Sequence, residues 1–256
     1  MNMEIEYRLD GRAGAPLLVL SNSLGTTFDM WQAQLPTWRE HFRVLRYNQR
    51  GHGATPLPRT PLRLETLGND VIALLDRLDA PSAHFCGISM GGLTGLWLNR
   101  YHPQRIDRLV VANTAARIGS AEGWQQRAQQ VRNEGLEAVA AASPSRWFTE
   151  AFLQRSPQRV AALVDGLAAS NAAGYAACCD ALAQADLRDQ TRQMARPMLV
   201  IAGEHDPVTT VADAEFLVAN APRAKLKVLP ASHISNVACA EEFGQSVIEF
   251  LTEKGG

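Results

Sequence analysis

The chain has 256 residues, and its 25 lysines and arginines nearly balance 26 aspartates and glutamates, for a net charge of −1. This length indicates one domain with room for an inserted subdomain, and the balanced charge predicts neither nucleic acid nor an anionic membrane as a partner. Residues 1–6 carry acidic side chains without an apolar h-region, and no apolar run approaches the ~18 residues of a membrane span, so we expect neither a signal peptide nor a membrane anchor.

In chain order, the first half of the sequence alternates short apolar runs with longer stretches of helical spacing. Apolar and polar residues alternate at 3–9, which is typical of a half-buried strand. The continuous apolar run at 17–20 is typical of a strand covered on both faces. Further strands are predicted at 42–47, 83–86 and 109–112, helices at 64–78 and 91–101, and loops at 21–30 and 51–61.

The alternation stops near Ala116 and resumes at Pro197. The later part predicts strands at 198–202 and 226–229 and helices at 211–219 and 242–251. Strands that alternate with helices predict an α/β fold, in which a mostly parallel sheet is flanked by helices on both faces. The intervening residues have helical spacing and few β-branched runs. We therefore expect a core at 1–116 and 195–256 with a helical insertion at 117–194.

The most informative motif is Gly87-x-Ser89-x-Gly91, which lies between a predicted strand and a predicted helix. This spacing is the nucleophile elbow, a tight strand-to-helix turn that exposes a serine hydroxyl at the edge of a sheet. Glycines two positions before and after the serine avoid collisions with the neighbouring strand and helix. The motif predicts Ser89 as a nucleophile.

A serine hydroxyl needs a general base, and that base needs an orienting carboxylate. In hydrolases with this elbow the partners follow in the order Ser, Asp or Glu, His. Asp206 follows the strand at 198–202, and His233 follows the strand at 226–229. The carboxyl ends of parallel strands share one edge of the sheet, so we expect a Ser89–His233–Asp206 triad there.

Other residues near these positions have competing interpretations. Glu204 and His205 are a rival acid and a rival base, one or two positions from Asp206. The other histidines are interpreted as structural; they are His41, His52, His84 and His102. Of these, His52 lies in a glycine-flanked loop that we expect near the site without substrate contact.

An oxyanion hole requires two backbone donors. The Met90 N–H lies at the start of the helix that follows the elbow, where unpaired amides and the helix dipole favour negative charge. The second donor is expected from the loop after the strand at 17–20, and we assign it to the Leu24 N–H.

The four cysteines, Cys86, Cys178, Cys179 and Cys239, lack the C-x-x-C or other spacing of a metal site. The adjacent pair at 178–179 is a poor disulfide framework. We therefore expect reduced thiols, no metal, and a cytoplasmic protein.

With this elbow and this order of Ser, Asp and His, the chain resembles the α/β-hydrolase superfamily over essentially its full length. Within it, the chain is similar to the 3-oxoadipate enol-lactonases (β-ketoadipate enol-lactone hydrolases). The more particular motifs are Asn22-Ser23-Leu24-Gly25, Arg146-Trp147-Phe148-Thr149 and Tyr175-Ala176-Ala177-Cys178-Cys179. Asn48 departs from the common pattern, in which an aspartate stands at this position.

The resemblance implies hydrolysis of 3-oxoadipate enol-lactone to 3-oxoadipate through a Ser89 acyl-enzyme, in the β-ketoadipate pathway of aromatic catabolism. It implies no cofactor, and it implies that the insertion covers the site as a cap. Arg146 and Trp147 are its candidate substrate contacts, although packing of Trp147 between cap and core is an equally good interpretation. The insertion balances eight arginines with eight acidic residues, so its charge alone does not indicate an anionic substrate.

Two alternatives remain open from the sequence. The same chemistry fits another esterase, a perhydrolase or a carbon–carbon hydrolase of this fold. A non-catalytic ligand-binding protein is the other alternative, because fold does not fix function. The intact Ser, Asp and His argue against it. The sequence does not indicate whether the protein is a monomer or a homo-oligomer.

Overall fold

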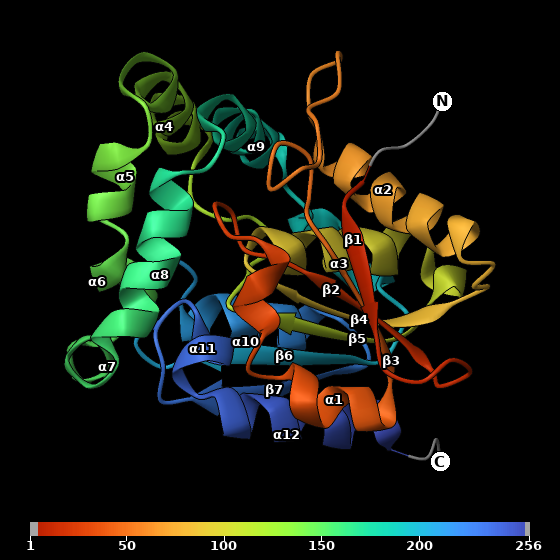
Figure 1. The fold of residues 1–256 in the computed structure, drawn as a ribbon. Helices are drawn as coiled ribbons and strands as arrows, with labels where there is room; N and C mark the ends of the chain where they lie inside the picture. Colours follow the sequence, from red (N-terminus) through yellow and green to blue (C-terminus); the bar gives the residue numbers. More distant parts are fainter. Residues whose placement is uncertain (1–4, 254–256) are drawn as a thin grey trace.

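The computed structural model of the protein describes residues 5–253. Within them, seven strands form one sheet in the order β1-β3-β2-β4-β5-β6-β7 (Figure 1). β1 pairs antiparallel with β3, and every other neighbouring pair is parallel. This confirms the predicted α/β fold with a mostly parallel sheet. The strands are β1 (Tyr7–Asp10), β2 (Leu17–Ser21), β3 (Arg43–Tyr47), β4 (Ala83–Ile88), β5 (Ile106–Ala112), β6 (Met198–Gly203) and β7 (Ala224–Leu229).

The central strands match their predictions within a few residues because both of their faces are buried. Every residue of β6 is buried, as are four of the five residues of β2. The first strand is shorter than the alternation at 3–9 predicts, since β1 begins at Tyr7. Met3 lies outside the described residues.

Helices cover both faces of the sheet. The helices α1 (Leu35–His41) and α12 (Ala240–Thr252) pack together on one face, and α2 (Leu64–Arg77) and α3 (Met90–Tyr101) lie on the other (Figure 1). The helix α10 (Val211–Asn220) packs against β6 and β7. Short elements complete this part: η1 (Phe28–Trp31), η2 (Pro103–Arg105) and α11 (Ser235–Ala238).

A group of helices stands between β5 and β6 in the chain and lies together beyond one edge of the sheet (Figure 1). Contacts between α4 and α9, and between α5 and α8, hold this group together. The elements of this group are α4 (Ala121–Glu134), α5 (Glu137–Ala141), α6 (Pro144–Trp147), α7 (Glu150–Arg155), α8 (Pro157–Ala168) and α9 (Ala172–Gln184). The following η3 (Arg188–Gln193) packs against α3 and α10. No helix among the described residues is long and apolar enough to cross a membrane.

Candidate active site

Ser89 occupies the turn between β4 and α3 with φ = 55° and ψ = −117°, a conformation that is rare for a residue with a side chain. Its N–H donates to the Ala112 carbonyl at 2.9 Å, which ties the turn to β5. A side chain at Gly87 would strike the Gly91 carbonyl, and one at Gly91 would strike the Ser21 carbonyl. Close backbone approach therefore explains the glycine spacing.

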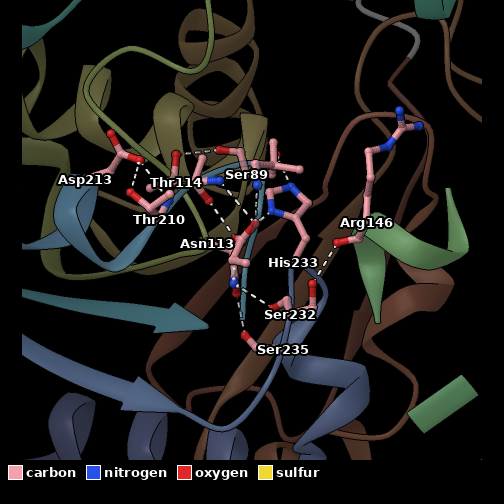
Figure 2. A network of polar contacts seen from close by, with 12 residues as sticks. Ser89, Asn113, Thr114, Arg146, Thr210, Asp213, Ser232, His233 and Ser235 are labelled. Carbon is pink, nitrogen blue, oxygen red and sulfur yellow. Dashed lines mark hydrogen bonds and ion pairs between the residues drawn. The ribbon is translucent and has the colours of Figure 1, made fainter. Parts of the chain in front are cut away.

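The structure brings the three predicted side chains together. His233 Nε2 lies 2.9 Å from Ser89 Oγ (Figure 2), and His233 Nδ1 lies 2.8 Å from Asp206 Oδ2. All three residues are buried, with 6% or less of each exposed. Because Asp206 can only accept at Oδ2 when ionised, Nδ1 carries the proton and Nε2 presents its lone pair to the serine hydroxyl.

Asp206 is held as an ionised acceptor by its surroundings. Oδ1 accepts the N–H groups of Val208 at 2.8 Å and Thr209 at 3.1 Å, and Oδ2 accepts the Thr209 hydroxyl at 2.8 Å. Burial works to raise the pKa of Asp206. The hydrogen bond and charge of His233, with further donors, outweigh it and hold the pKa below its ordinary value.

Asn113 links the two loops that carry Asp206 and His233. Its Nδ2 donates to Asp206 Oδ2 and to the Ser232 carbonyl, both at 3.0 Å. Its Oδ1 accepts from the Ser235 hydroxyl (Figure 2). Asn113 follows β5 and has φ = 45°, which an asparagine tolerates better than most residues. No role for Asn113 was predicted from the sequence, because its contacts depend on strand neighbours that are distant in the chain.

The rival acid and base lie elsewhere. The side chains of Glu204 and His205 are 60% and 56% exposed and face each other at 4.0 Å. Neither lines the pocket beside Ser89. The structure therefore brings Asp206 and His233 to the serine, and their catalytic roles stay a prediction.

The two predicted oxyanion-hole amides belong to Met90, which follows Ser89 in the chain, and to Leu24, which lines the same pocket as Ser89. Met90 is the first residue of α3, so its N–H has no partner within the helix. The Leu24 N–H has no hydrogen-bond partner among residues 5–253. Leu24 and Ser89 line one pocket, together with His233. Two unpartnered donors beside a nucleophile can stabilise a developing oxyanion.

The pocket has a volume of about 260 Å³ and is walled by both the sheet edge and the 117–194 insertion. Among the described residues its lining holds two arginines, Arg127 and Arg146, and no acidic side chain. Neither guanidinium forms an ion pair within the described chain. Burial, and then the neighbouring Arg127 charge, lower the pKa of Arg146. The pocket therefore suits an anionic group.

Arg146 and Trp147, the candidate substrate contacts, line this pocket, and their contact with substrate stays a prediction. Their backbone has a second role. The Arg146 carbonyl accepts from Ser232 Oγ at 2.8 Å (Figure 2), and the Trp147 carbonyl accepts from the Ile234 N–H at 3.1 Å. These bonds flank His233 on both sides, so α6 fixes the loop that carries the imidazole.

The pocket residues that had no predicted role include Trp124, Arg127 and Tyr175. Trp124 and Arg127 are three residues apart and so share one face of α4. That spacing could have been recognised in the sequence as a pair of side chains on one helix face. The sequence could not indicate that this face of α4, rather than another, turns toward Ser89. Tyr175 lies in a motif that the resemblance used without assigning it a role.

The arrangement as a whole supports nucleophilic acyl transfer. A hydroxyl is hydrogen-bonded to a base, and the base is oriented by a buried carboxylate. No cluster of three or more histidine, cysteine or acidic side chains in residues 5–253 could hold a metal ion.

Comparisons with known proteins extend over nearly the whole chain. The alpha/beta hydrolase fold family matches residues 16–237. The chain is 50% identical to 3-oxoadipate enol-lactonase 2 of Acinetobacter baylyi, over 96% of this chain and 92% of that protein. It is 41% identical to 3-oxoadipate enol-lactonase 1 of the same organism, with the same coverage. It superposes on the enol-lactonase from Burkholderia xenovorans LB400 with a TM-score of 0.96 and 45% identity, covering 98% of this chain and 97% of that one.

Proposed function

The chain belongs to the alpha/beta hydrolase family, and from that premise we propose that it hydrolyses 3-oxoadipate enol-lactone to 3-oxoadipate. Relatives named as 3-oxoadipate enol-lactonases at 50% and 41% identity support this substrate. The reaction belongs to the β-ketoadipate pathway of aromatic catabolism. It makes the protein a carboxylic ester hydrolase.

One observation carries the proposal: the Ser89–His233 pair opens into a small pocket that holds two arginines without a carboxylate partner. The proposed substrate is a five-membered lactone with a carboxylate side chain. Arg127 and Arg146 would receive that carboxylate through charge-assisted hydrogen bonds. The apolar wall at Trp124 and Trp147 would face the ring.

In the proposed acylation, Ser89 Oγ attacks the lactone carbonyl while His233 Nε2 takes its proton. The tetrahedral oxyanion lies against the N–H groups of Leu24 and Met90. Collapse breaks the ring carbon–oxygen bond, and the imidazolium returns the proton to the departing enol oxygen. An enol is a better leaving group than an alkoxide, so this step needs little further activation. The enol then tautomerises to the ketone.

Deacylation repeats the sequence with water as the nucleophile. His233 takes a proton from water, the hydroxide attacks the acyl carbon, and Ser89 leaves with that proton to release 3-oxoadipate. Asp206 keeps Nδ1 protonated and stabilises the imidazolium in both halves. The chemistry is complete with the side chains of this chain, and we propose no cofactor.

We further propose that residues 117–194 act as a cap on a core of 1–116 and 195–256. The pocket supports this division, because Arg127 and Tyr175 come from the insertion while Ser89 and His233 come from the sheet edge. Four free cysteines fit a reducing compartment, so we place the reaction in the cytoplasm.

The experiment that tests this function follows the loss of enol-lactone absorbance, with the lactone generated in place by muconolactone isomerase. We expect turnover by the wild type and a loss of ~10⁴–10⁶ in turnover for Ser89→Ala or His233→Ala. No consumption of lactone by micromolar wild-type enzyme would overturn the substrate. A Ser89→Ala variant with a tenth of wild-type turnover would overturn the nucleophile. A panel of nitrophenyl esters and vinylogous diketones, assayed in parallel, separates the other hydrolase chemistries.

A further inference from the structure

His52 lies outside the pocket but binds the loop that carries the Leu24 amide. The N–H of Gly25 donates to His52 Nε2 at 3.0 Å, and His52 Nδ1 lies 3.2 Å from the Arg50 carbonyl. An amide only donates and a carbonyl only accepts, so Nδ1 carries the proton and Nε2 is the acceptor. The ring is 1% exposed, and burial lowers its pKa to about 4. His52 is therefore neutral in this tautomer at neutral pH.

Leu24 and Gly25 are the two central residues of a tight turn over residues 23–26. In this turn the position of the Gly25 amide restricts the position of the Leu24 amide. The turn is closed by the Thr26 N–H donating to the Ser23 carbonyl at 3.2 Å, and Gly25 has φ = 79°. A left-handed residue at the third turn position leaves the peptide between Leu24 and Gly25 one orientation. Since His52 holds the Gly25 end of that peptide, it limits rotation of Leu24.

The loop at 49–52, which carries His52, also binds the turn at a second point. Gln49 Nε2 donates to the Ser23 carbonyl at 3.2 Å, so two side chains of residues 49–52 hold residues 23–25. From the opposite side, the Gly91 N–H donates to the Asn22 carbonyl at 3.1 Å and ties the loop to the elbow helix. These bonds hold residues 22–25 in one conformation before substrate arrives.

We propose that His52 is a positioning residue for the oxyanion hole: its Nε2 lone pair holds the Gly25 amide and thereby aims the Leu24 N–H at the reacting carbonyl oxygen. The inference rests on the proposed function, which assigns Leu24 to that hole. Fixed donors stabilise an oxyanion because they need no reorganisation during the reaction, and a displacement of ~1 Å at such a group can cost ~10²-fold in rate.

Two substitutions separate this role from simple packing. In His52→Gln the longer side chain can place Oε1 where Nε2 was and accept the Gly25 N–H. In His52→Asn the shorter amide can still donate to the Arg50 carbonyl but cannot reach Gly25. His84→Gln is the matched control, because His84 is a partly buried histidine on β4 with no contact to the turn at 23–26.

Kinetics with 4-nitrophenyl acetate, which needs no carboxylate site, give the main readout. We expect His52→Asn to lower kcat and kcat/KM together by ~10–10², with KM nearly unchanged. His52→Gln should recover most of the loss, and His84→Gln should keep wild-type kcat. Phenylboronic acid, whose serine adduct places an oxygen in the hole, should lose affinity for the asparagine variant by a similar factor.

The proposal is overturned if His52→Asn keeps more than half of wild-type kcat, or if the asparagine and glutamine variants lose equally. Nitrogen NMR of the histidine rings in the wild type decides the matter if a variant does not fold. An unprotonated Nε2 on His52 at neutral pH supports the proposal, and a protonated one overturns it. If the wild type leaves the enol-lactone intact while His52→Asn still loses ester turnover, the substrate assignment fails and the positioning role stands.

Discussion

The Asp206 carboxylate accepts hydrogen bonds from five donors, which include His233 Nδ1, Asn113 Nδ2 and the Thr209 hydroxyl. These donors leave the side chain no freedom to rotate, so the imidazole keeps one tautomer and one orientation. The same donors hold the pKa of Asp206 below its ordinary value despite burial. The carboxylate that we propose as the orienting group of the triad therefore also contributes to stability.

We expect Asp206→Asn to lower turnover by ~10⁴, because an amide cannot fix the His233 tautomer. It should also lower the free energy of unfolding by about 1–3 kcal/mol at neutral pH. A depressed folded pKa contributes stability that is present above the ordinary value of 3.8 and is lost as pH falls through the folded pKa. Urea denaturation of both proteins should thus show their difference shrinking below about pH 4. A difference that widens in acid would contradict this assignment.

Asn48 departs from the pattern that the resemblance led us to expect, and its contacts explain why an amide suits this chain. Its Nδ2 donates to Glu6 Oε2 at 2.7 Å, while its Oδ1 accepts the Phe28 N–H at 2.8 Å. Glu6 Oε2 also accepts the Ala54 N–H at 2.7 Å. A second carboxylate in place of the amide would face Glu6 at hydrogen-bond distance without a proton to share.

We expect Asn48→Asp to destabilise the protein by about 1–3 kcal/mol at neutral pH, through like-charge repulsion and the lost hydrogen bond. Protonation of either carboxyl relieves the repulsion, so the melting temperature should approach that of the wild type as pH falls. The double variant Asn48→Asp/Glu6→Gln supplies the missing donor and should recover most of the loss. Equal melting temperatures for wild type and Asn48→Asp at neutral pH would refute the account.

At the scale of elements, helix α9 meets the core through two glycines. An added side-chain carbon on Gly174 would strike the carbonyl of Gly51, and one on Gly51 would strike the Gly174 backbone. Cys178, one turn further along α9, lies with its Sγ 3.7 Å from the Arg50 carbonyl. The backbone of the insertion is therefore packed directly against the backbone of the loop at 50–53. Tyr175, next to Gly174 on α9, lines the pocket.

Gly174→Ala should separate α9 from the loop at 50–53 and destabilise the protein by about 1–3 kcal/mol, as overpacked cores do. Because Tyr175 would move with the helix, KM for the lactone should rise more than kcat falls. Gly166→Ala on α8 is the control: nothing lies within 4 Å of the added carbon. It should be neutral or stabilising by up to about 1 kcal/mol. Thermal unfolding and steady-state kinetics of the pair check both expectations.

The elements that the sequence predicts best are the central strands, because both faces of these strands are buried. The sequences of these strands are continuous apolar runs. Their alternation with helices along the chain was sufficient to predict a mostly parallel sheet. The helix α1 was missed because its seven residues are too few to show a helical repeat of apolar positions. In the site, Ser89, Asp206 and His233 were predictable because each follows a strand whose carboxyl end is at one edge. Asn113 and Arg127 were not, since their contacts depend on how distant segments pack.

The charge of the molecule likewise shows what composition cannot predict. Eight arginines and eight acidic residues cancel across the insertion, so composition gives no indication of an anion site. Folding nevertheless places Arg127 and Arg146 in one pocket and leaves every acidic side chain of the described residues outside its lining. The pocket is walled by the sheet edge and by the insertion, so an anion bound there would hold the two parts together.

A dicarboxylate that resembles the product should therefore stabilise the whole fold, because it binds the folded state alone. Adipate at a hundred times its Kd should add about 2.7 kcal/mol, or roughly 5–10 °C in melting temperature for a chain of this size. Ser89→Ala should keep this shift, since it leaves both cations in place. Arg159→Met removes an exposed arginine of the same insertion that lies outside the pocket, and it should keep the shift as well. The double variant Arg127→Met/Arg146→Met should lose it, and a full shift in that variant would show that the carboxylate binds elsewhere.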